Sequence, residues 1–348
     1  MRATTIIKGI AVTGAMSGMA FAAIVHAQAQ GRVSAECRRE IVQMCGRNRG
    51  AIRECLREKA ATLGEDCRAE LRERMGAMRE PGARAGQRTS GGQEIVYGSD
   101  PLQRLDFHAA KTSAPAPLVL FVHGGGWKRG DKDNATGTFK APHFTGLGYH
   151  FASTNYRLVP AATVEQQAAD VAAALAALLR QADSLGIDRR KVVLMGHSAG
   201  AHLVALVGTD PQYLRAAGLS PNDVAGIIPL DGAGYDVPAQ MGENAMLMGD
   251  TYEQAFGTDL ARQRAVSPTF NAAAPNVSDW LIAHVERADA KRQSDGLAAA
   301  LRSSGAKAEV RAFSGRGLQG HAEINRRMGD PDYPATPVVD AWLKDLFG

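Results

Sequence analysis

Short apolar runs alternate with longer helical patterns along residues 93–348 of this 348-residue chain. Strands that are buried on both faces of a sheet read as continuous apolar runs, and parallel strands need helical crossovers between them. The alternation therefore predicts an α/β fold, with a mostly parallel sheet and helices on both faces. The predicted strands are residues 118–122, 151–154, 192–194, 227–230 and 281–285, and the predicted helices are residues 163–182, 199–207 and 293–303.

Residues 1–29 have the three parts of a secretory signal peptide. Arg2 and Lys8 are basic, residues 9–25 are mostly small or apolar, and small residues follow, so that cleavage after Ala27 or Ala29 fits the pattern. An uncleaved membrane anchor is the alternative, but glycines interrupt the apolar run, which is short for a bilayer span of about 20 residues. We expect a periplasmic or secreted protein.

All four cysteines lie within 31 residues near the N-terminus, at Cys37, Cys45, Cys55 and Cys67. An even, clustered count in an exported chain predicts two disulfides, for which three pairings are possible. A zinc site is the alternative, but the spacings lack the close cysteine pairs that structural zinc sites usually show. Because apolar residues recur here at helical spacing, we expect residues 33–79 to form a small helical module stapled by disulfides.

A stretch rich in Gly, Pro and polar residues, 80–92, is predicted to be a flexible linker to a catalytic domain over residues 93–348.

The net charge of +4 is unevenly distributed along the chain, because residues 31–88 hold 14 Lys or Arg against 9 Asp or Glu. The larger part is then slightly acidic, which argues against a nucleic acid substrate. The basic module could contact an anionic envelope surface electrostatically. Solvated charged faces of its helices would explain the excess of basic residues equally well.

The segment from Gly196 to Gly200 fits the pattern G-x-S-x-G, with Ser198 at its centre. It follows a predicted strand and precedes a predicted helix, which is the context that this motif requires. A sharp turn there exposes the serine, and the N-terminus of the helix stabilises developing negative charge. Ser198 is therefore the expected nucleophile.

A second motif, H-G-G-G-W at residues 123–127, follows the strand predicted at residues 118–122. Acyl transfer passes through a tetrahedral oxyanion that needs preorganised N–H donors, and glycines let the backbone approach it closely. We expect the oxyanion hole to be formed by the backbone N–H groups of Gly125, Gly126 and Ala199.

The general base is expected to be a histidine downstream of the serine. His202 lies in a predicted helix and His284 in a predicted strand. His321 follows residues 314–320, which are predicted to be a flexible loop at the sheet edge, so His321 is the expected base.

The acid that orients this base should follow a late strand, and the sequence leaves several candidates. Asp289 and Glu286 both follow the strand predicted at residues 281–285, and we favour Asp289 because it lies further into the loop. Asp231, at the end of an earlier strand, is the third candidate.

These motifs together resemble the α/β-hydrolases of the esterase and lipase group, which includes hormone-sensitive lipase-like enzymes, bacterial feruloyl and acetylxylan esterases, and arylformamidases. The resemblance covers about residues 93–348 and implies the α/β-hydrolase fold. Val285 departs from it, because the family usually has glycine there. The segments that carry the resemblance are Tyr97-Gly98, Gln103 to Asp106, the oxyanion loop from His123 through Lys132, Asn155 to Leu158, Gly196 to Leu203, Gln293-Ser294 and His321.

The cysteine run resembles the cysteine-rich repeat of Golgi glycoproteins and some bacterial exported proteins. In that family the outer and inner cysteines pair. The resemblance implies disulfides between Cys37 and Cys67 and between Cys45 and Cys55.

The expected function is that of an exported serine esterase, acting by two-step acyl transfer on a small-molecule or glycan-linked ester with a short acyl or aryl group. No metal and no organic cofactor is implied. By analogy with the family, residues 232–279 could shape the substrate pocket as a partial lid, and ordinary packing would explain their apolar residues equally well. An amidase such as an arylformamidase, or a peptidase, would use the same triad, and a non-catalytic envelope-binding protein is the alternative from another class.

Overall fold

A computed structural model of the chain describes residues 35–45, 55, 62–65, 67–68, 92–133, 137–273 and 275–348. The chain divides into two compact units, Met1–Gln87 and Arg88–Gly348. The predicted signal peptide, and the predicted linker up to residue 91, lie outside the described residues. Within the described ranges, no helix is long and apolar enough to cross a membrane.

Two nested disulfides cross-link the N-terminal unit. Cys37 pairs with Cys67 and Cys45 with Cys55, which is the pairing that the resemblance implies. The Cα atoms of the two pairs lie 4.8 and 5.7 Å apart. The inner disulfide thus closes a short loop inside the longer loop that the outer disulfide closes.

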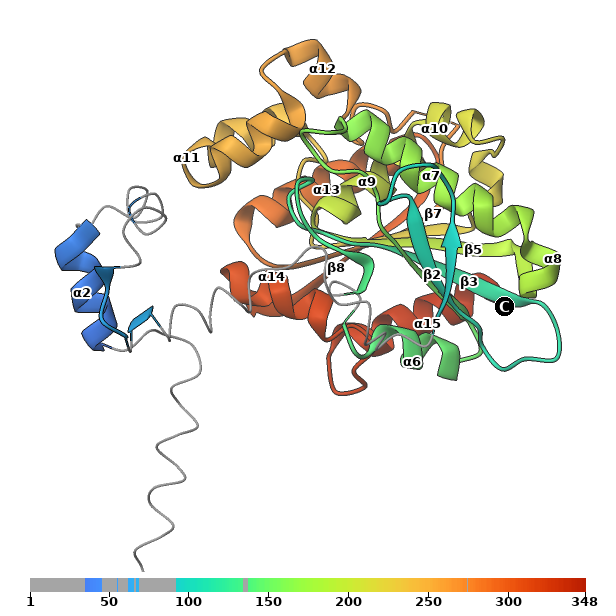
Figure 1. Cartoon of the computed structure of the whole chain (residues 1–348). Coiled ribbons are helices and arrows are strands. Elements are labelled where there is room, and N and C mark those ends of the chain that lie inside the picture. Colours follow the sequence, from blue (N-terminus) through green and yellow to red (C-terminus); the bar gives the residue numbers. More distant parts are fainter. Residues whose placement is uncertain are drawn as a thin grey trace, which may run out of the picture. The chain divides into compact units, whose positions relative to one another are not determined.

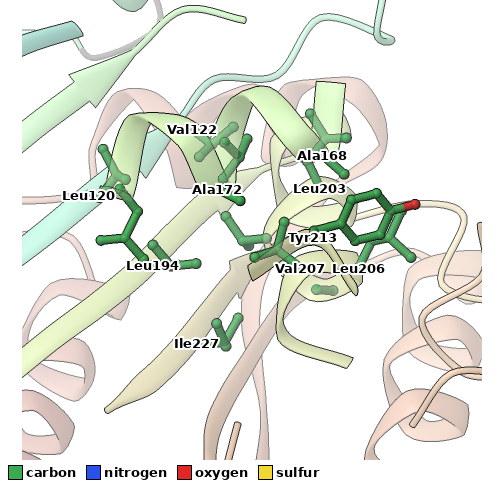
Figure 2. Packing of buried hydrophobic residues seen from close by; sticks show 14 of the residues in the cluster. Leu120, Val122, Ala168, Ala172, Leu194, Leu203, Leu206, Val207, Tyr213 and Ile227 are labelled. Atoms are coloured by element: carbon green, nitrogen blue, oxygen red, sulfur yellow. The ribbon is translucent and has the colours of Figure 1, made fainter. Parts of the chain in front are cut away.

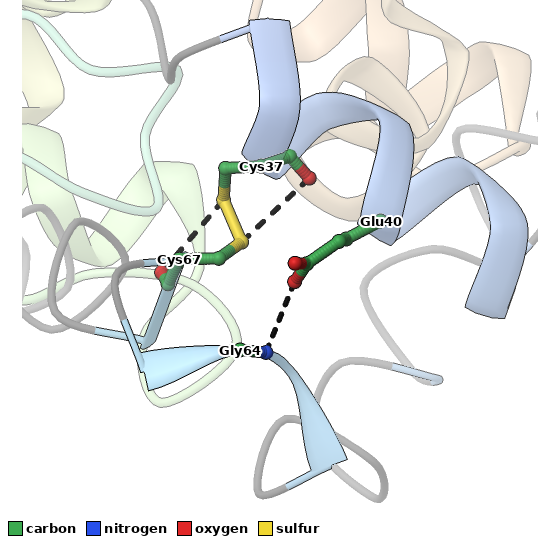
Figure 3. The surroundings of a disulfide bond; sticks show 4 residues. All are labelled: Cys37, Glu40, Gly64 and Cys67. Atoms are coloured by element: carbon green, nitrogen blue, oxygen red, sulfur yellow. Dashed lines mark hydrogen bonds between the residues drawn. A yellow bond between two sulfur atoms is a disulfide. The ribbon is translucent and has the colours of Figure 1, made fainter.

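Helix α2 (Ala35–Cys45) carries one cysteine of each disulfide. Beside the outer disulfide, the backbone N–H of Gly64 donates a hydrogen bond of 3.0 Å to the carboxylate of Glu40 (Figure 3). Cys37, Ile41 and Cys67 are buried, as is Leu63. A core this small gains most from covalent cross-links, because it can bury little apolar surface.

The C-terminal unit is built on an eight-stranded sheet in the order β1-β2-β4-β3-β5-β6-β7-β8 (Figure 1). β1 and β2 are antiparallel to their neighbours, and the other pairs are parallel. The strands are β1 (Gln93–Val96), β2 (Arg104–His108), β3 (Ala116–Val122), β4 (His150–Thr154), β5 (Ile187–His197), β6 (Gly226–Leu230), β7 (Asp279–Glu286) and β8 (Lys307–Arg316).

Helices cover both faces of this sheet (Figure 1). One face packs against α7 (Val164–Arg180), α9 (Ala199–Thr209) and α13 (Ala288–Ser303), and the other against α6 (Lys140–Gly146), α14 (Gly317–Arg326) and α15 (Ala335–Phe347). The remaining helical elements are α8 (Ala182–Leu185), α10 (Pro211–Ala216), η3 (Pro221–Asp223), α11 (Val237–Phe256) and α12 (Leu260–Ala265).

The core on the first face positions the central strands against α7 and α9. Leu120 and Leu194 come from β3 and β5, and they pack with Ala172 of α7 and Leu203 of α9, all fully buried (Figure 2). The second core lies on the other face and holds α14 through Ile324. The sheet and both helix layers therefore form one rigid support for the ends of the central strands.

The five predicted strands and three predicted helices are present, and three strands were not predicted. β1 and β8 are edge strands with few buried residues, so neither has a continuous apolar run. β2 is short and contains charged residues. The prediction of a flexible loop at residues 314–320 is wrong, because these residues are the end of β8 and the first turn of α14.

Candidate active site

Ser198 lies in the sharp turn between β5 and α9, with backbone angles φ 56° and ψ −118°. Such a positive φ is costly for a serine and persists only where the surroundings enforce it. They do so here because the chain is tightly packed on both sides of Ser198. A Cβ at Gly196 would lie 2.3 Å from the carbonyl oxygen of Gly200, and one at Gly200 would lie 2.1 Å from that of Val122.

His321 reaches Ser198 from α14. Its Nε2 atom lies 3.0 Å from Ser198 Oγ, so the hydroxyl can donate its proton to the imidazole. The backbone oxygen of His321 accepts a hydrogen bond of 2.8 Å from Nε2 of His197, whose ring packs against the His321 ring at 4.5 Å between centroids. His197 therefore contacts both the backbone and the ring of His321, which lies on a helix instead of the expected loop.

The structure corrects the expected partner of this histidine. The carboxylate next to Nδ1 of His321 belongs to Asp231, at 2.5 Å, and not to Asp289. Asp231 follows β6 directly and is fully buried, with φ 45°. The end of β6 points its carboxylate at the sheet edge where β5 presents Ser198, because parallel neighbours end at the same edge. Ser198, His321 and Asp231 thus form one hydrogen-bonded line.

The two carboxylates favoured from the sequence bind elsewhere. Asp289 forms an ion pair of 3.1 Å with Arg287, and Glu286 is half exposed and pairs with Arg316 at 3.1 Å. Glu286 is the last residue of β7 and Asp289 already belongs to the first turn of α13. Each of these carboxylates is therefore engaged by an arginine, whereas Asp231 is the carboxylate that contacts His321.

Arg287 is a site residue that the sequence reasoning did not identify. Its Nη1 atom lies 3.0 Å from Asp231 Oδ2 and 2.9 Å from His321 Nδ1. The side chain is 14% exposed. The feature of the sequence that could have identified Arg287 is its position directly after β7, where its side chain can reach the ends of the neighbouring strands.

Three donors stabilise the buried Asp231 carboxylate. Its Oδ1 atom accepts the backbone N–H of Val285 at 3.0 Å, and its Oδ2 atom accepts from His321 and Arg287. Burial opposes ionisation, but the hydrogen bond from His321 and the positive charge of Arg287 hold the pKa of Asp231 below its ordinary value. The carboxylate is therefore ionised at neutral pH and can stabilise an imidazolium.

The oxyanion loop follows β3 and reaches the same edge of the sheet. Gly125 and Gly126 have φ values of 130° and 62°, and a Cβ at Gly125 would lie 2.0 Å from the carbonyl oxygen of Arg129. Gly124 lies against Ser198, since a Cβ there would come within 2.9 Å of Ser198 Cβ. Ala199 is the first residue of α9, so its N–H has no acceptor within the helix.

Two buried aromatic residues, Tyr156 and Trp127, hold the first part of this loop, residues 123–127. Tyr156 donates a hydrogen bond of 2.9 Å to the carbonyl oxygen of His123, and the two rings stack at 4.3 Å. At the other end, Nε1 of Trp127 donates to Nδ1 of His202 at 3.3 Å, while Nε2 of His202 donates to the carbonyl oxygen of Val266. Burial lowers the pKa of both His123 and His202 to about 4, so each is neutral at physiological pH.

Helix α11 covers the oxyanion loop. The methyl group of Thr251 would lie 2.8 Å from a Cβ at Gly126, and Phe256 packs edge-on against Trp127 at 4.6 Å. The segment expected to act as a partial lid, residues 232–279, contains this helix and α12. A pocket of about 390 Å³ is lined on α11 by Asp250, Glu253 and Gln254.

The described residues contain no group of three or more His, Cys, Asp or Glu side chains that could hold a metal ion. The candidate site combines a serine hydroxyl, an imidazole, a buried carboxylate and backbone N–H groups. This set can carry out acyl transfer through a covalent intermediate.

Comparisons with known proteins find an esterase and a formamidase among the similar chains. Residues 105–220 match the BD-FAE family. The chain is 35% identical to the esterase LipC of Mycobacterium tuberculosis over 126 residues, which are 35% of this chain and 31% of the relative. It is 29% identical to the kynurenine formamidase of Danio rerio over 146 residues, which are 41% of this chain and 48% of that relative. The chain therefore spans less than half the length of these relatives.

Solved structures share the fold of the C-terminal unit. Esterase B of Lactobacillus rhamnosis has a TM-score of 0.59 at 19% identity, covering 83% of this chain and 95% of its own. The acetyl ester-xyloside bifunctional hydrolase of Caldicellulosiruptor lactoaceticus has a TM-score of 0.60 at 18% identity, covering 74% of this chain and 99% of its own. At these identities the likeness concerns the arrangement of strands and helices.

Proposed function

We propose that this chain, which has the α/β-hydrolase fold of known esterases, is a serine hydrolase that cleaves carboxylic esters with short acyl or aryl groups. The observation that carries the proposal is the line from Ser198 Oγ through His321 to Asp231, with contacts of 3.0 and 2.5 Å. Similarity to LipC and to the BD-FAE family supports an ester as the bond that is cleaved.

In the first half of the reaction His321 takes the proton of Ser198 at Nε2 while Oγ attacks the ester carbonyl carbon. The Nδ1–H group of His321 donates to Asp231, which stabilises the imidazolium that forms. The oxygen of the tetrahedral intermediate is bound by the N–H groups of Gly125, Gly126 and Ala199. Collapse of the intermediate breaks the bond to the alcohol, which leaves with the proton from Nε2.

In the second half a water molecule replaces the alcohol. His321 takes a proton from the water as its oxygen attacks the acyl carbon, and the same three N–H groups bind the second oxyanion. Ser198 then leaves with the proton from Nε2, and the carboxylic acid is released. The serine and histidine return to their starting protonation states.

An amide is the second candidate substrate. The match to kynurenine formamidase covers 41% of this chain, and the same residues can cleave an amide if His321 protonates the leaving nitrogen. A comparison of kcat/KM for an aryl ester and the matching N-formyl arylamine decides between the two bonds. A higher value for the arylamine would contradict the ester assignment while leaving the serine mechanism intact.

Export is part of the proposal. Two disulfides are typical of proteins that fold outside the cytosol, which supports a periplasmic or secreted location together with the sequence pattern of residues 1–29. The basic N-terminal unit is proposed to contact an anionic envelope surface or polymer. Salt-sensitive retention of the protein on envelope fractions tests this, and retention that does not respond to salt contradicts it.

The test of the proposed function is hydrolysis of aryl acetate, aryl butyrate and methyl ferulate by the disulfide-bonded protein, beside Ser198→Ala. We expect turnover that is lost in this variant, and labelling of Ser198 by a fluorophosphonate. Ser184→Ala is the matched control, because the hydroxyl of Ser184 is on the surface and donates to the nearby carbonyl oxygen of Gln181. A folded wild-type protein with neither turnover nor labelling would contradict the proposal and favour a binding protein.

A further inference from the structure

Arg287 bridges two carboxylates at the candidate active site. Its Nη1 atom faces Asp231 Oδ2 at 3.0 Å, while Nη2 and Nε face the two carboxylate oxygens of Asp289 at 3.1 and 3.3 Å. The bond to Asp289 is a two-point contact, which fixes the plane of the guanidinium. Arg287 and Asp289 are 14% and 23% exposed, so the pair is largely shielded from water.

A guanidinium in this position raises a difficulty for the proposed reaction. His321 must carry its proton on Nδ1 for Nε2 to accept from Ser198, so the Nδ1–H and Nη1–H groups are both donors although the nitrogens lie only 2.9 Å apart. Both can point at Asp231 Oδ2. When His321 takes the proton of Ser198, however, an uncompensated cation at this distance would oppose the new positive charge.

Asp289 removes this difficulty. The pair of Arg287 and Asp289 is neutral, so Asp231 keeps a whole negative charge for the imidazolium while it still receives a hydrogen bond from Arg287. Burial works against ionisation of Asp289, but the neighbouring Arg287 keeps the pKa of its carboxyl below the ordinary value. Arg287, Asp289 and Asp231 together carry one negative charge, and the imidazolium of His321 brings the net charge of the four groups to zero.

We propose that Arg287 and Asp289 are positioning residues that act as one unit: Arg287 orients the Asp231 carboxylate, and Asp289 cancels the charge that Arg287 brings beside His321. This inference rests on the proposed function and concerns the same site. It gives Asp289 a role that depends on Arg287, unlike that of a triad acid.

A double-mutant cycle separates these roles, with Asp289→Asn, Arg287→Met and the double variant measured on an aryl acetate. We expect Asp289→Asn to lower kcat about 10- to 100-fold with little change in KM, because the uncompensated guanidinium opposes the transition state. Arg287→Met loses one hydrogen bond to Asp231 and is expected to lower kcat about tenfold. The double variant should be about as active as Arg287→Met, so the second substitution rescues Asp289→Asn.

A neighbouring ion pair supplies the matched control. Arg316 and Glu286 also lie at the ends of β8 and β7, at 3.1 Å, but they are 89% and 51% exposed and do not contact Asp231 or His321. The corresponding cycle with Arg316→Met and Glu286→Gln is expected to leave kcat within about twofold, since exposed pairs contribute little. Urea unfolding of every variant checks that the kcat values refer to folded protein.

Two results would overturn the inference. If the losses multiply in the double variant, Arg287 and Asp289 act independently. If Asp289→Asn loses 1,000-fold or more and Arg287→Met does not restore it, Asp289 is the triad acid itself. Failure of the proposed function looks different, because the wild-type protein would then show neither turnover nor labelling of Ser198 by a fluorophosphonate.

Discussion

Replacing Asp231 by Asn tests the assignment of the acid most directly. The change keeps the shape of the side chain but replaces one carboxylate oxygen by an NH₂ group. In the structure both oxygens are used as acceptors, one by the N–H of Val285 at 3.0 Å and the other by His321 and Arg287 at 2.5 and 3.0 Å. An amide can satisfy only one of these two sides.

Either orientation of the amide is costly. If its oxygen faces Val285, the NH₂ group faces Nδ1 of His321, which must then become an acceptor and move its proton to Nε2. That tautomer cannot take the proton of Ser198, and such a change lowers kcat about 10⁴-fold in a Ser-His-Asp triad. If the oxygen faces His321 instead, the buried N–H of Val285 loses its acceptor at a cost of about 1–3 kcal/mol.

We therefore expect Asp231→Asn to lower kcat by about 10³- to 10⁴-fold, or about 4–5.5 kcal/mol of activation free energy, with KM nearly unchanged. The assay is steady-state hydrolysis of an aryl acetate at neutral pH, with Ser198→Ala as the background and circular dichroism to check folding. Asp289→Asn is the matched comparison. The assignment is refuted if Asp231→Asn keeps more than a tenth of the wild-type kcat while Asp289→Asn loses a thousandfold.

Two further predictions concern stability. Gly200→Ala places a Cβ 2.1 Å from the carbonyl oxygen of Val122, so it should destabilise the protein by about 1–3 kcal/mol or more. Gly296→Ala places a Cβ with no atom within 4 Å and should stabilise its helix by up to about 1 kcal/mol. Equal shifts of the urea midpoint in the two variants would contradict this. Below pH 6.5 the unfolded chain protonates His123 and His202, but the folded chain does so only near pH 4. The free energy of unfolding should then fall, between pH 6.5 and 4, by about 1.4 kcal/mol per pH unit for each histidine, and a urea-derived stability that stays flat over this range would show that these residues are not buried neutral.

Sequence patterns predicted the centre of the fold because it is uniformly buried. β3, β6 and the second half of β5 are mostly apolar and buried, and the chain packs closely around Gly196 and Gly200, on either side of Ser198. Edge strand β8 has the opposite character, because most of its residues are exposed or only partly buried, and its pattern resembles that of a loop. The sequence pattern therefore identifies buried strands and misses exposed ones.

The acid could not be chosen from the sequence for a related reason. Asp231, Glu286 and Asp289 are all carboxylates at or shortly after the end of a strand. What distinguishes them is the surroundings of each side chain in the folded protein. Asp231 is completely buried, whereas Glu286 is 51% exposed. Arg287 does not distinguish them in the sequence either, because in the structure it pairs both with Asp231 from the end of β6 and with Asp289 two residues away.

The hydrogen bonds at the ends of the strands have a consequence for how this protein should lose activity on heating. The N–H of Ser198 binds the carbonyl oxygen of Leu230, next to Asp231, and the N–H of Asp231 binds that of Ala283. The backbones of Ser198 and Asp231 are thus hydrogen-bonded to neighbouring strands of the sheet. Of the three proposed catalytic residues, only His321 lies within a helix, α14. Thermal inactivation should coincide with melting of the sheet, unless α14 detaches first.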